Sequence, residues 1–147
     1  MKITTPAFLE NQQIPPTYSC DGDNINPPLE ISDVPENAKS LAIIMDDPDA
    51  PNGTFTHWLM WNIIPTITKI EENDWPEGAE QGINGRGELG YTGPKPPSGT
   101  HHYYFKVYAL NKKLDVSANI NREELEREIE TGLIDKAELV GVYSSLN

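Results

Sequence analysis

The sequence is poor in cysteine and in basic residues. Cys20 is the only cysteine among 147 residues, so an internal disulfide and metal motifs built from several cysteines are excluded. Lysine and arginine together number 11 against 23 aspartates and glutamates, which gives a formal net charge of −12. Nucleic-acid binding requires clustered basic side chains, so a nucleic-acid partner is excluded as well.

Long hydrophobic runs are also missing. A membrane-spanning helix needs about 20 consecutive apolar residues, and no segment of this chain approaches that length. We therefore expect no integral membrane segment. The first residues, Met1 to Glu10, lack the apolar core of a secretory signal, so we expect no such signal. Together with the excess of acidic residues, these absences predict a cytoplasmic protein.

Prolines and glycines, by contrast, are plentiful. The 13 prolines and 11 glycines divide the chain into short segments, as in a β-sandwich or a β-barrel rather than a helical bundle. The length is that of one domain, which we expect to span residues 1–147. Apolar, aromatic and β-branched residues predict strands at 41–45, 55–64 and 101–110, weaker strands at 29–31 and 137–143, and an edge strand at 3–8.

One helix has clear start signals. Asn121 is a suitable N-cap, and Glu124 follows three residues later, as in a capping box. Leu125 and Ile129 are four residues apart and form a narrow apolar stripe on a mostly charged segment. We therefore expect this helix to pack at the periphery of a sheet. A second, short helical turn is predicted within residues 75–84.

Two long segments, residues 17–28 and 82–100, show no hydrophobic periodicity. Segments of this length without regular structure are often functional when they occur in a compact domain. The glycines of the second segment recur irregularly and lack the strand and helix that flank a nucleotide-binding loop. The sequence therefore indicates a functional loop but no nucleotide site.

Strand alternation sorts the histidines at the start of the 101–110 strand. His101 and Tyr103 share a face that carries no charge beyond its first residue, whereas His102 shares the opposite face with Lys106. We therefore expect His101 and Tyr103 to point into the core and His102 to point outward. This assignment assumes that no β-bulge interrupts the start of the strand.

The same alternation applied to residues 55–64 places His57 with Leu59, Trp61 and Ile63. Both faces of this segment are apolar, so alternation does not identify the face that points to the core. It does predict that the His57 ring is shielded from bulk solvent.

An acidic corner follows the 41–45 strand. Asp47 and Asp49 flank Pro48, and Pro51 follows two residues after Asp49; the two prolines end the strand and stiffen the backbone. A strand end is a place where a sheet can present polar groups at the mouth of a cavity. An ordinary polar turn after a strand explains the same pattern.

Three kinds of chemistry remain open for inward histidines beside a rigid carboxylate. A divalent metal is one, although His57 and His101 belong to different strands and lack a ligand spacing. Acid–base catalysis by an Asp–His pair is another, although no serine stands in a strand–turn–helix elbow. The third is the capture of an anion by imidazole, phenol and loop N–H donors.

Several segments together resemble the phosphatidylethanolamine-binding protein family, in its short bacterial and archaeal branch that is often described as Raf-kinase-inhibitor-like. They are Ser19-Cys20-Asp21-Gly22, Asn26-Pro27-Pro28-Leu29, Asp47-Pro48-Asp49-Ala50-Pro51, Thr56-His57-Trp58, Gly90-Tyr91-x-Gly93-Pro94-x-Pro96-Pro97-x-Gly99-x-His101-His102-Tyr103 and Ala137-Glu138-Leu139-x-Gly141-x-Tyr143. They follow one another in order over nearly the whole chain, and the two proline-rich segments are specific in combination.

The resemblance implies a mainly β fold, a sandwich of two antiparallel sheets with one or two peripheral helices. It also implies a small surface cavity for phosphate-type anions and phospholipid head groups. By motif position, the ligand-binding residues are Asp47, Asp49, His57, Pro97, His101 and Tyr103. The family often has arginine between the histidine and the tyrosine, where this chain has His102. The chain also lacks the extra C-terminal helix of eukaryotic members.

These features predict a binding protein rather than an enzyme, with no catalytic residue, metal or cofactor. The expected ligand is a small anion such as phosphate or phosphorylethanolamine, and occupancy of the cavity is expected to regulate a partner kinase or protease. A homodimer is left open. The alternatives are a small hydrolase that uses an Asp–His pair and an interaction module with a vestigial pocket.

Overall fold

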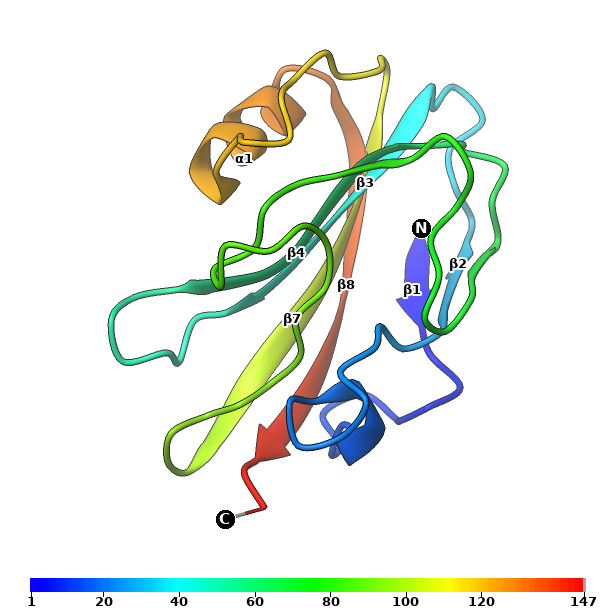
Figure 1. Cartoon of the computed structure of the whole chain (residues 1–147). Coiled ribbons are helices and arrows are strands. Elements are labelled where there is room, and N and C mark those ends of the chain that lie inside the picture. The colour runs from blue at the N-terminus through cyan, green and yellow to red at the C-terminus, as the bar shows by residue number, and fades with distance from the viewer. Residues whose placement is uncertain (147) are drawn as a thin grey trace.

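Two antiparallel sheets form the framework of the protein, and a helix packs on the outside of the larger one. The structure, a computed structural model, describes residues 1–146. The elements in chain order (Figure 1) are β1 (Lys2–Thr4), the 3-10 turn η1 (Pro16–Tyr18), β2 (Leu29–Ser32), β3 (Ser40–Asp47), β4 (Phe55–Ile63), β5 (Lys69–Ile70), β6 (Glu80–Gln81), β7 (Thr100–Leu110), α1 (Arg122–Glu130) and β8 (Leu133–Ser144).

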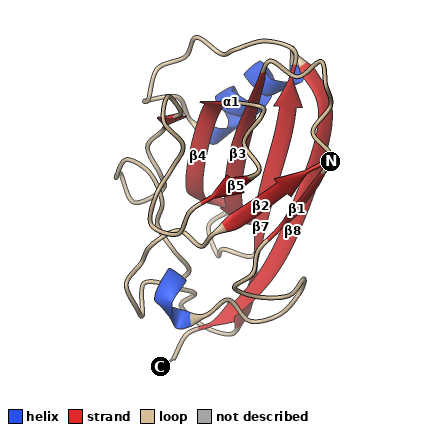
Figure 2. Ribbon diagram, turned by 90° about the vertical axis from the view of Figure 1, so that its right-hand side faces the viewer, coloured by secondary structure: helices blue, strands red, loops and turns tan. Residues whose placement is uncertain are grey.

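The large sheet has the strand order β6-β4-β3-β7-β8, and the small sheet has the order β1-β2-β5. Every pairing between these strands is antiparallel. Figure 2 shows the small sheet in front of the large one and α1 behind it. The predicted fold class, a mainly β sandwich of two antiparallel sheets with a peripheral helix, is therefore confirmed.

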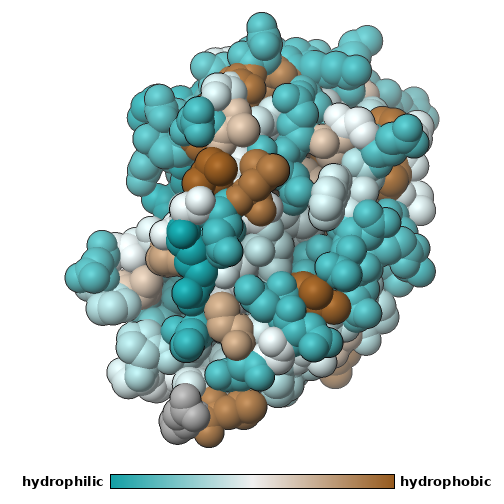
Figure 3. All heavy atoms as spheres, viewed as in Figure 1, coloured by the Kyte–Doolittle hydropathy of each residue, from teal (hydrophilic) through white to brown (hydrophobic). Residues whose placement is uncertain are grey.

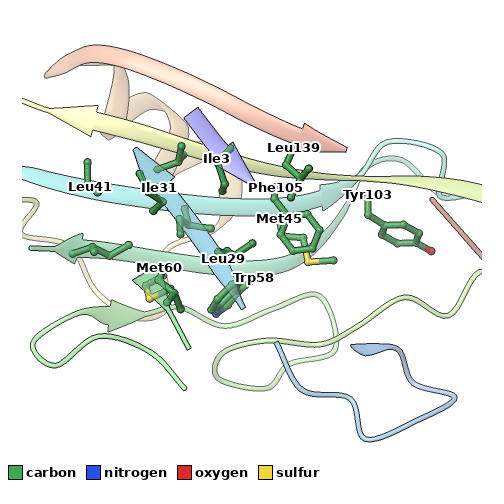
Figure 4. Packing of buried hydrophobic residues seen from close by; sticks show 14 of the residues in the cluster. Ile3, Leu29, Ile31, Leu41, Met45, Trp58, Met60, Tyr103, Phe105 and Leu139 are labelled. Atoms are coloured by element: carbon green, nitrogen blue, oxygen red, sulfur yellow. The ribbon is translucent and has the colours of Figure 1, made fainter. Parts of the chain in front are cut away.

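The large sheet is covered on both faces, which explains why β3 is an unbroken run of buried residues. Its inner face packs on the small sheet through the main core, which includes Met45, Trp58 and Phe105 (Figure 4). Its outer face carries a second core beneath α1, to which Trp61 and Leu125 belong. Apolar side chains on both faces of β3 are what a strand between two cores requires.

The helix α1 starts where the sequence predicts. The Asn121 side chain accepts a hydrogen bond from the Glu124 N–H at 2.8 Å, and the Glu124 carboxylate accepts one from the Asn121 N–H at 3.2 Å. This reciprocal capping box satisfies two donors that a helix leaves free at its first turn. Leu125 and Ile129 are buried against the sheet, as predicted for a peripheral helix.

Three local predictions differ from the structure. The N-terminal edge strand covers only Lys2–Thr4, because the chain bends from Pro6 onward. The short helical turn predicted within residues 75–84 is wrong, since this segment forms a turn followed by β6. β5 and β6 have two residues each, too few to produce a periodic pattern in the sequence.

The outer edge of β8 is partly covered by an N-terminal segment, residues 11–14. Asn11 N–H donates to Val140 O at 2.8 Å, and Ile14 N–H donates to Val142 O at 2.7 Å. Gly141 lies between these two contacts, and a Cβ there would come within 2.6 Å of the Ile14 side chain. A glycine at this position therefore lets the segment lie directly against the strand.

Candidate functional site

A small recess opens where the end of β3 meets the beginnings of β4 and β7. Antiparallel pairing brings these three strand ends to the same edge of the sheet, with Asp47 opposite Phe55. The recess has a volume of about 110 Å³ and is lined by Asp47, Ala50, Pro51, Phe55, His57, Arg86, Lys95, Pro96, Pro97, His101 and Tyr103. Five of the six residues predicted as ligand-binding therefore lie together.

His57 reaches the recess because β4 contains a β-bulge. Strand pairing joins Met45 to Trp58 and then Asp46 to Thr56, so His57 is an extra residue with no opposing partner. A bulge places two consecutive side chains on the same side of a strand and re-aims the extra one. His57 and Trp58 therefore both face inward.

The bulge corrects the alternation predicted for β4. His57 does not share a face with Leu59 and Trp61, which belong to the outer core under α1. Its ring instead lies 4.8 Å from that of Phe55, which also lines the recess. Ile63 returns to the inner core after a second register shift near the other end of the strand. The prediction that the His57 ring is shielded from solvent is confirmed, since the residue is 3% exposed.

The His57 ring is held by the loop that runs along β4. Its Nδ1 lies 2.7 Å from the Thr92 carbonyl oxygen, and the Thr92 N–H donates to the His57 carbonyl at 3.0 Å. A carbonyl oxygen only accepts, so the Nδ1 atom carries the proton of the ring. Burial lowers the pKa of His57 from 6.5 to about 4, which outweighs the opposing effects of the Thr92 carbonyl and the Asp47 charge. His57 is therefore neutral at pH 7.

His101 is oriented by the acidic corner after β3. Its Nδ1 donates to Asp47 Oδ2 at 2.7 Å, and Asp47 Oδ1 accepts the Asp49 N–H at 2.8 Å. Both histidine and carboxylate are largely buried, with side-chain exposures of 10% and 5%. The two bonds to Asp47 fix the carboxylate, and the carboxylate in turn fixes the imidazole ring.

Tyr103 forms the floor between the two histidines. Its ring packs edge-on against His57 at 5.2 Å and is stacked on His101 at 6.4 Å. Burial, followed by the Asp47 and Asp49 charges, raises the pKa of Tyr103. Its hydroxyl therefore keeps its proton at neutral pH and is available as a donor. The inward direction predicted for His101 and Tyr103 is confirmed.

Three polar atoms around the recess have no hydrogen-bond partner in the described part of the chain: His57 Nε2, His101 Nε2 and the Tyr103 hydroxyl. Within residues 1–146, Trp61 Nε1 is the only fully enclosed side-chain nitrogen or oxygen without such a partner. The three recess atoms are therefore not enclosed, and the recess that their rings line gives access to them. In Figure 4 the Tyr103 ring lies at one end of the main core, with its oxygen directed away from Phe105 and Met45.

The recess also has two cationic side chains that the sequence analysis did not select. Arg86 and Lys95 come from the long 82–100 loop, and both residues are exposed. Neither has an ion-pair partner among the residues that the structure describes. The segment was predicted to be functional, but no local pattern distinguishes these two cations from other surface residues. They supply positive charge to a site where the sequence has His102 in place of the family's arginine.

Asp49 is the one predicted residue that the structure separates from the recess. Its Oδ2 accepts hydrogen bonds from the His102 N–H at 2.8 Å and from the His102 ring at 2.7 Å. The bond from the His102 ring, followed by that from the backbone N–H, lowers the pKa of Asp49. His102 points outward, as predicted. The pair therefore lies outside the lining and closes the acidic corner from the solvent side.

A larger groove, here called the outer groove, lies on the opposite face of the large sheet beside α1. It has a volume of about 530 Å³ and is lined by Lys106, Tyr108, Glu126, Ile129, Glu130, Leu133, Lys136, Ala137 and Glu138. We place the candidate site in the small recess because three largely buried side chains there, His57, His101 and Tyr103, keep polar atoms that have no partner among residues 1–146. Lys106 in the groove, by contrast, is paired with Asp46 at 3.1 Å.

Neither a metal centre nor a membrane-spanning helix is found in the described part of the chain. No three histidine, cysteine, aspartate or glutamate side chains within residues 1–146 gather closely enough to hold a metal ion. Over the same residues, no helix combines the length and apolar composition that crossing a bilayer requires. Figure 3 shows a surface on which hydrophilic residues predominate and hydrophobic ones form small separate groups.

Comparisons with known proteins agree with this architecture. The family model of the phosphatidylethanolamine-binding protein matches residues 4–144. A UPF0098 protein from Methanothermobacter thermautotrophicus is 46% identical over 148 residues, which cover 97% of this chain and 98% of that protein. The crystal structure of a putative phosphatidylethanolamine-binding protein homolog from Chlamydia trachomatis has a TM-score of 0.93 at 40% identity and covers 98% of this chain and 97% of its own.

A second solved structure, that of YbcL from E. coli, is described as a new member of the mammalian phosphatidylethanolamine-binding protein family. It has a TM-score of 0.92 at 33% identity, and the match covers 98% of each chain. Sequence and structure therefore match over almost the full length of the chain. The chain belongs to the phosphatidylethanolamine-binding protein family.

Proposed function

We propose that the chain binds a small anion in the recess between β3, β4 and β7, either free phosphate or the phosphate of a head group such as phosphorylethanolamine. The observation that carries this proposal is the set of polar side-chain atoms that have no partner among residues 1–146: His57 Nε2, His101 Nε2 and the Tyr103 hydroxyl. Buried polar groups are normally hydrogen-bonded, so a site that keeps several of them free is arranged for a ligand or for ordered water.

The size of the recess suits an ion rather than a large molecule. Sites for drug-sized ligands have volumes of about 300–1,000 Å³, whereas this one has about 110 Å³. A group of a few heavy atoms fills that space. A larger phosphorylated ligand would insert its phosphate and leave the rest of the molecule outside.

The charges around the recess favour an anion in spite of the overall charge of −12. The Tyr103 hydroxyl donates from the floor, and the His101 ring, which Asp47 orients, lines the recess beside it. Arg86 and Lys95 stand at the mouth without ion-pair partners among the described residues. Charge-assisted hydrogen bonds from such donors are stronger than neutral ones. Asp47, whose two oxygens both accept hydrogen bonds within the protein, acts mainly on the orientation of His101.

The lining favours binding over catalysis. An Asp47–His101 pair is present, but the lining residues include no serine, threonine or cysteine that the pair would activate. We therefore assign the pair an orienting role. Regulation of a partner kinase or protease through the loops around the recess, a cytoplasmic location and a homodimer stay predictions.

Titration with phosphate and with phosphorylethanolamine, followed by the ring signals of the three histidines, tests the proposal. We expect the signals of His57 and His101 to shift in a saturable way, because both rings line the recess. His102, which is exposed and bonded to Asp49, serves as the internal control and is expected to move least. A ligand that shifts His102 but neither of the other two contradicts the proposed site.

A further inference from the structure

The His57 ring presents a lone pair, not a proton, to the recess. Its single proton in the neutral state is on Nδ1, which donates to the Thr92 carbonyl at 2.7 Å. The Thr92 N–H returns a hydrogen bond to the His57 carbonyl at 3.0 Å, so the two residues are joined twice. Rings of Phe55 and Tyr103 pack on the imidazole at 4.8 and 5.2 Å. With Nδ1 occupied in this way, Nε2 is left as an acceptor.

Charging the ring to remove this lone pair is unfavourable at neutral pH. Burial lowers the pKa of His57 to about 4, so the imidazolium form is about a thousandfold less populated than the neutral form at pH 7. The charged groups that face the ring are Asp47 from β3, His101 from β7 and Arg86 from the 82–100 loop. Asp47 favours the imidazolium, while Arg86 and His101 oppose it.

An oxygen without a proton is repelled by such an acceptor, whereas a P–OH group donates to it. We propose that His57 accepts a hydrogen bond from the ligand, so that the recess selects phosphate species that carry a proton over phosphodiesters and over fully ionised phosphomonoesters. This inference rests on the proposed function and adds a specificity-determining role for His57. His57 accepts a hydrogen bond from the protonated oxygen of the phosphate. The charged oxygens are bound by the other polar side chains of the recess, which are His101, Tyr103, Arg86 and Lys95.

Free phosphate and a phosphomonoester differ in the pH at which they lose that proton. A phosphomonoester loses its second proton with a pKa of about 6, so the protonated monoanion becomes scarce as the pH rises above that value. Inorganic phosphate retains at least one proton throughout the neutral range. A phosphodiester has no proton to donate at any of these pH values. The three ligands therefore separate the effect of the P–OH group from the effect of charge.

Calorimetric titrations of the full chain with inorganic phosphate, phosphorylethanolamine and dimethyl phosphate at pH 6 and pH 8 test the inference. We expect the affinity for phosphorylethanolamine, relative to that for inorganic phosphate, to fall roughly 50-fold between the two pH values, as its protonated fraction does. The ratio cancels any effect of pH on the recess itself, because both ligands meet the same side chains. We expect dimethyl phosphate to bind at least about tenfold more weakly than inorganic phosphate.

The possible results distinguish the role of His57 from anion binding itself. A constant or rising ratio, or dimethyl phosphate that binds as tightly as phosphate, overturns the role of His57 and leaves anion binding intact. Failure of all three ligands to bind overturns the proposed function together with this inference.

A variant and a spectroscopic measurement complete the test. In His57→Phe we expect phosphate to bind only as weakly as dimethyl phosphate binds the natural chain, and the pH dependence of the ratio to disappear. Because this variant removes the bond to Thr92 and can fail to fold, ring ¹⁵N signals of the natural chain in saturating phosphate provide a second readout. We expect His57 Nδ1 protonated and Nε2 unprotonated in the complex; two protonated nitrogens would overturn the inference.

Discussion

The recess and the outer groove lie on opposite faces of the large sheet, and their polar side chains differ in whether they have partners within the protein. In the groove and the depression that continues it, the less exposed charged side chains form ion pairs: Lys106 with Asp46 at 3.1 Å, and Arg122 with Glu126 at 3.4 Å. The other charged residues of the groove, Glu130, Lys136 and Glu138, are exposed to solvent. In the recess, one nitrogen of His57, one nitrogen of His101 and the Tyr103 hydroxyl have no hydrogen-bond partner among the described residues. The larger groove is therefore the weaker candidate for a ligand site. Polar atoms of buried side chains that lack a hydrogen-bond partner, rather than a large volume, indicate that a ligand binds.

Neighbouring residues illustrate how sharply the two faces differ. Asp46 and Asp47 are adjacent in β3, and both are 3% exposed. Asp46 faces outward and pairs with a lysine, whereas Asp47 faces inward and orients a histidine that lines the recess. Because neighbouring side chains in a strand point to opposite faces, we assign Asp46 a role in stability and Asp47 a role in the candidate site. The following predictions test this division, beginning with the largest effect.

The largest effect is expected from acid acting on His57. Because burial lowers its pKa from 6.5 to about 4, the unfolded chain binds more protons than the folded chain between these two pH values. The free energy of unfolding should therefore fall as the pH drops through this window, with a contribution from His57 of about 3 kcal/mol. Urea denaturation of the natural chain and of His57→Gln at pH 7 and pH 4.5 measures this contribution. Equal pH dependence in both proteins would contradict the buried neutral state of the ring.

The substitution His101→Ala should weaken phosphate binding by about 2 kcal/mol, or about 30-fold. It removes from the recess a largely buried ring that Asp47 orients. Calorimetry on the folded variant gives the change in affinity. An affinity within twofold of the natural value would mean that the anion is held elsewhere.

The substitution Lys106→Met should act on stability and leave the recess unchanged. It removes the cation beside Asp46, whose side chain is 4% exposed, and retains much of the lysine's apolar volume. Leaving this carboxylate without its partner should lower the free energy of unfolding by about 1.5 kcal/mol, since the lysine itself is partly exposed. Chemical denaturation measures the loss, and phosphate titration is the control. A marked loss of phosphate affinity would show that the two faces are coupled.

The smallest effect is expected from His102→Ala. Its ring pairs with Asp49 on the surface, with side-chain exposures of 49% and 42%. Exposed pairs of this kind contribute about 0.5 kcal/mol or less to stability, and the ring does not line the recess. Phosphate affinity should stay within about twofold of the natural value. A larger change would assign the neighbouring Asp49 to the ligand after all.

The parts of the molecule that local pattern determines were predictable from the sequence. The capping box at Asn121 and the alternation of His101 and Tyr103 in β7 depend on residues close together in the chain, and the structure confirms both. The bulge at His57 depends instead on how β4 pairs with β3, which no pattern within β4 reveals. Strand alternation therefore grouped this histidine with Leu59 and Trp61, which belong to the outer core, whereas its ring lines the recess, where motif resemblance predicts it.

The residues that were missed share a single physical cause. Arg86 and Lys95 come to the recess on a long loop whose course is set by contacts with β4 and with the η1 region, such as Gly85 N–H to Thr56 O and Cys20 N–H to Pro94 O. β5 and β6 likewise exist only because they pair with longer strands. Tertiary contacts of this kind leave no periodic signal in a single sequence.

The segment of residues 11–14 that lies along β8 has a consequence for how copies of the protein behave in a crowded solution. An uncovered edge strand is a template on which another chain can add its own strand and start an aggregate. Hydrogen bonds from Asn11 and Ile14 occupy the carbonyls of Val140 and Val142, so this half of the edge is unavailable to a neighbour. The N-terminal residues therefore protect this part of β8 from pairing with another copy of the protein. They can lie against the strand because Gly141 has no Cβ atom, which would clash with Ile14.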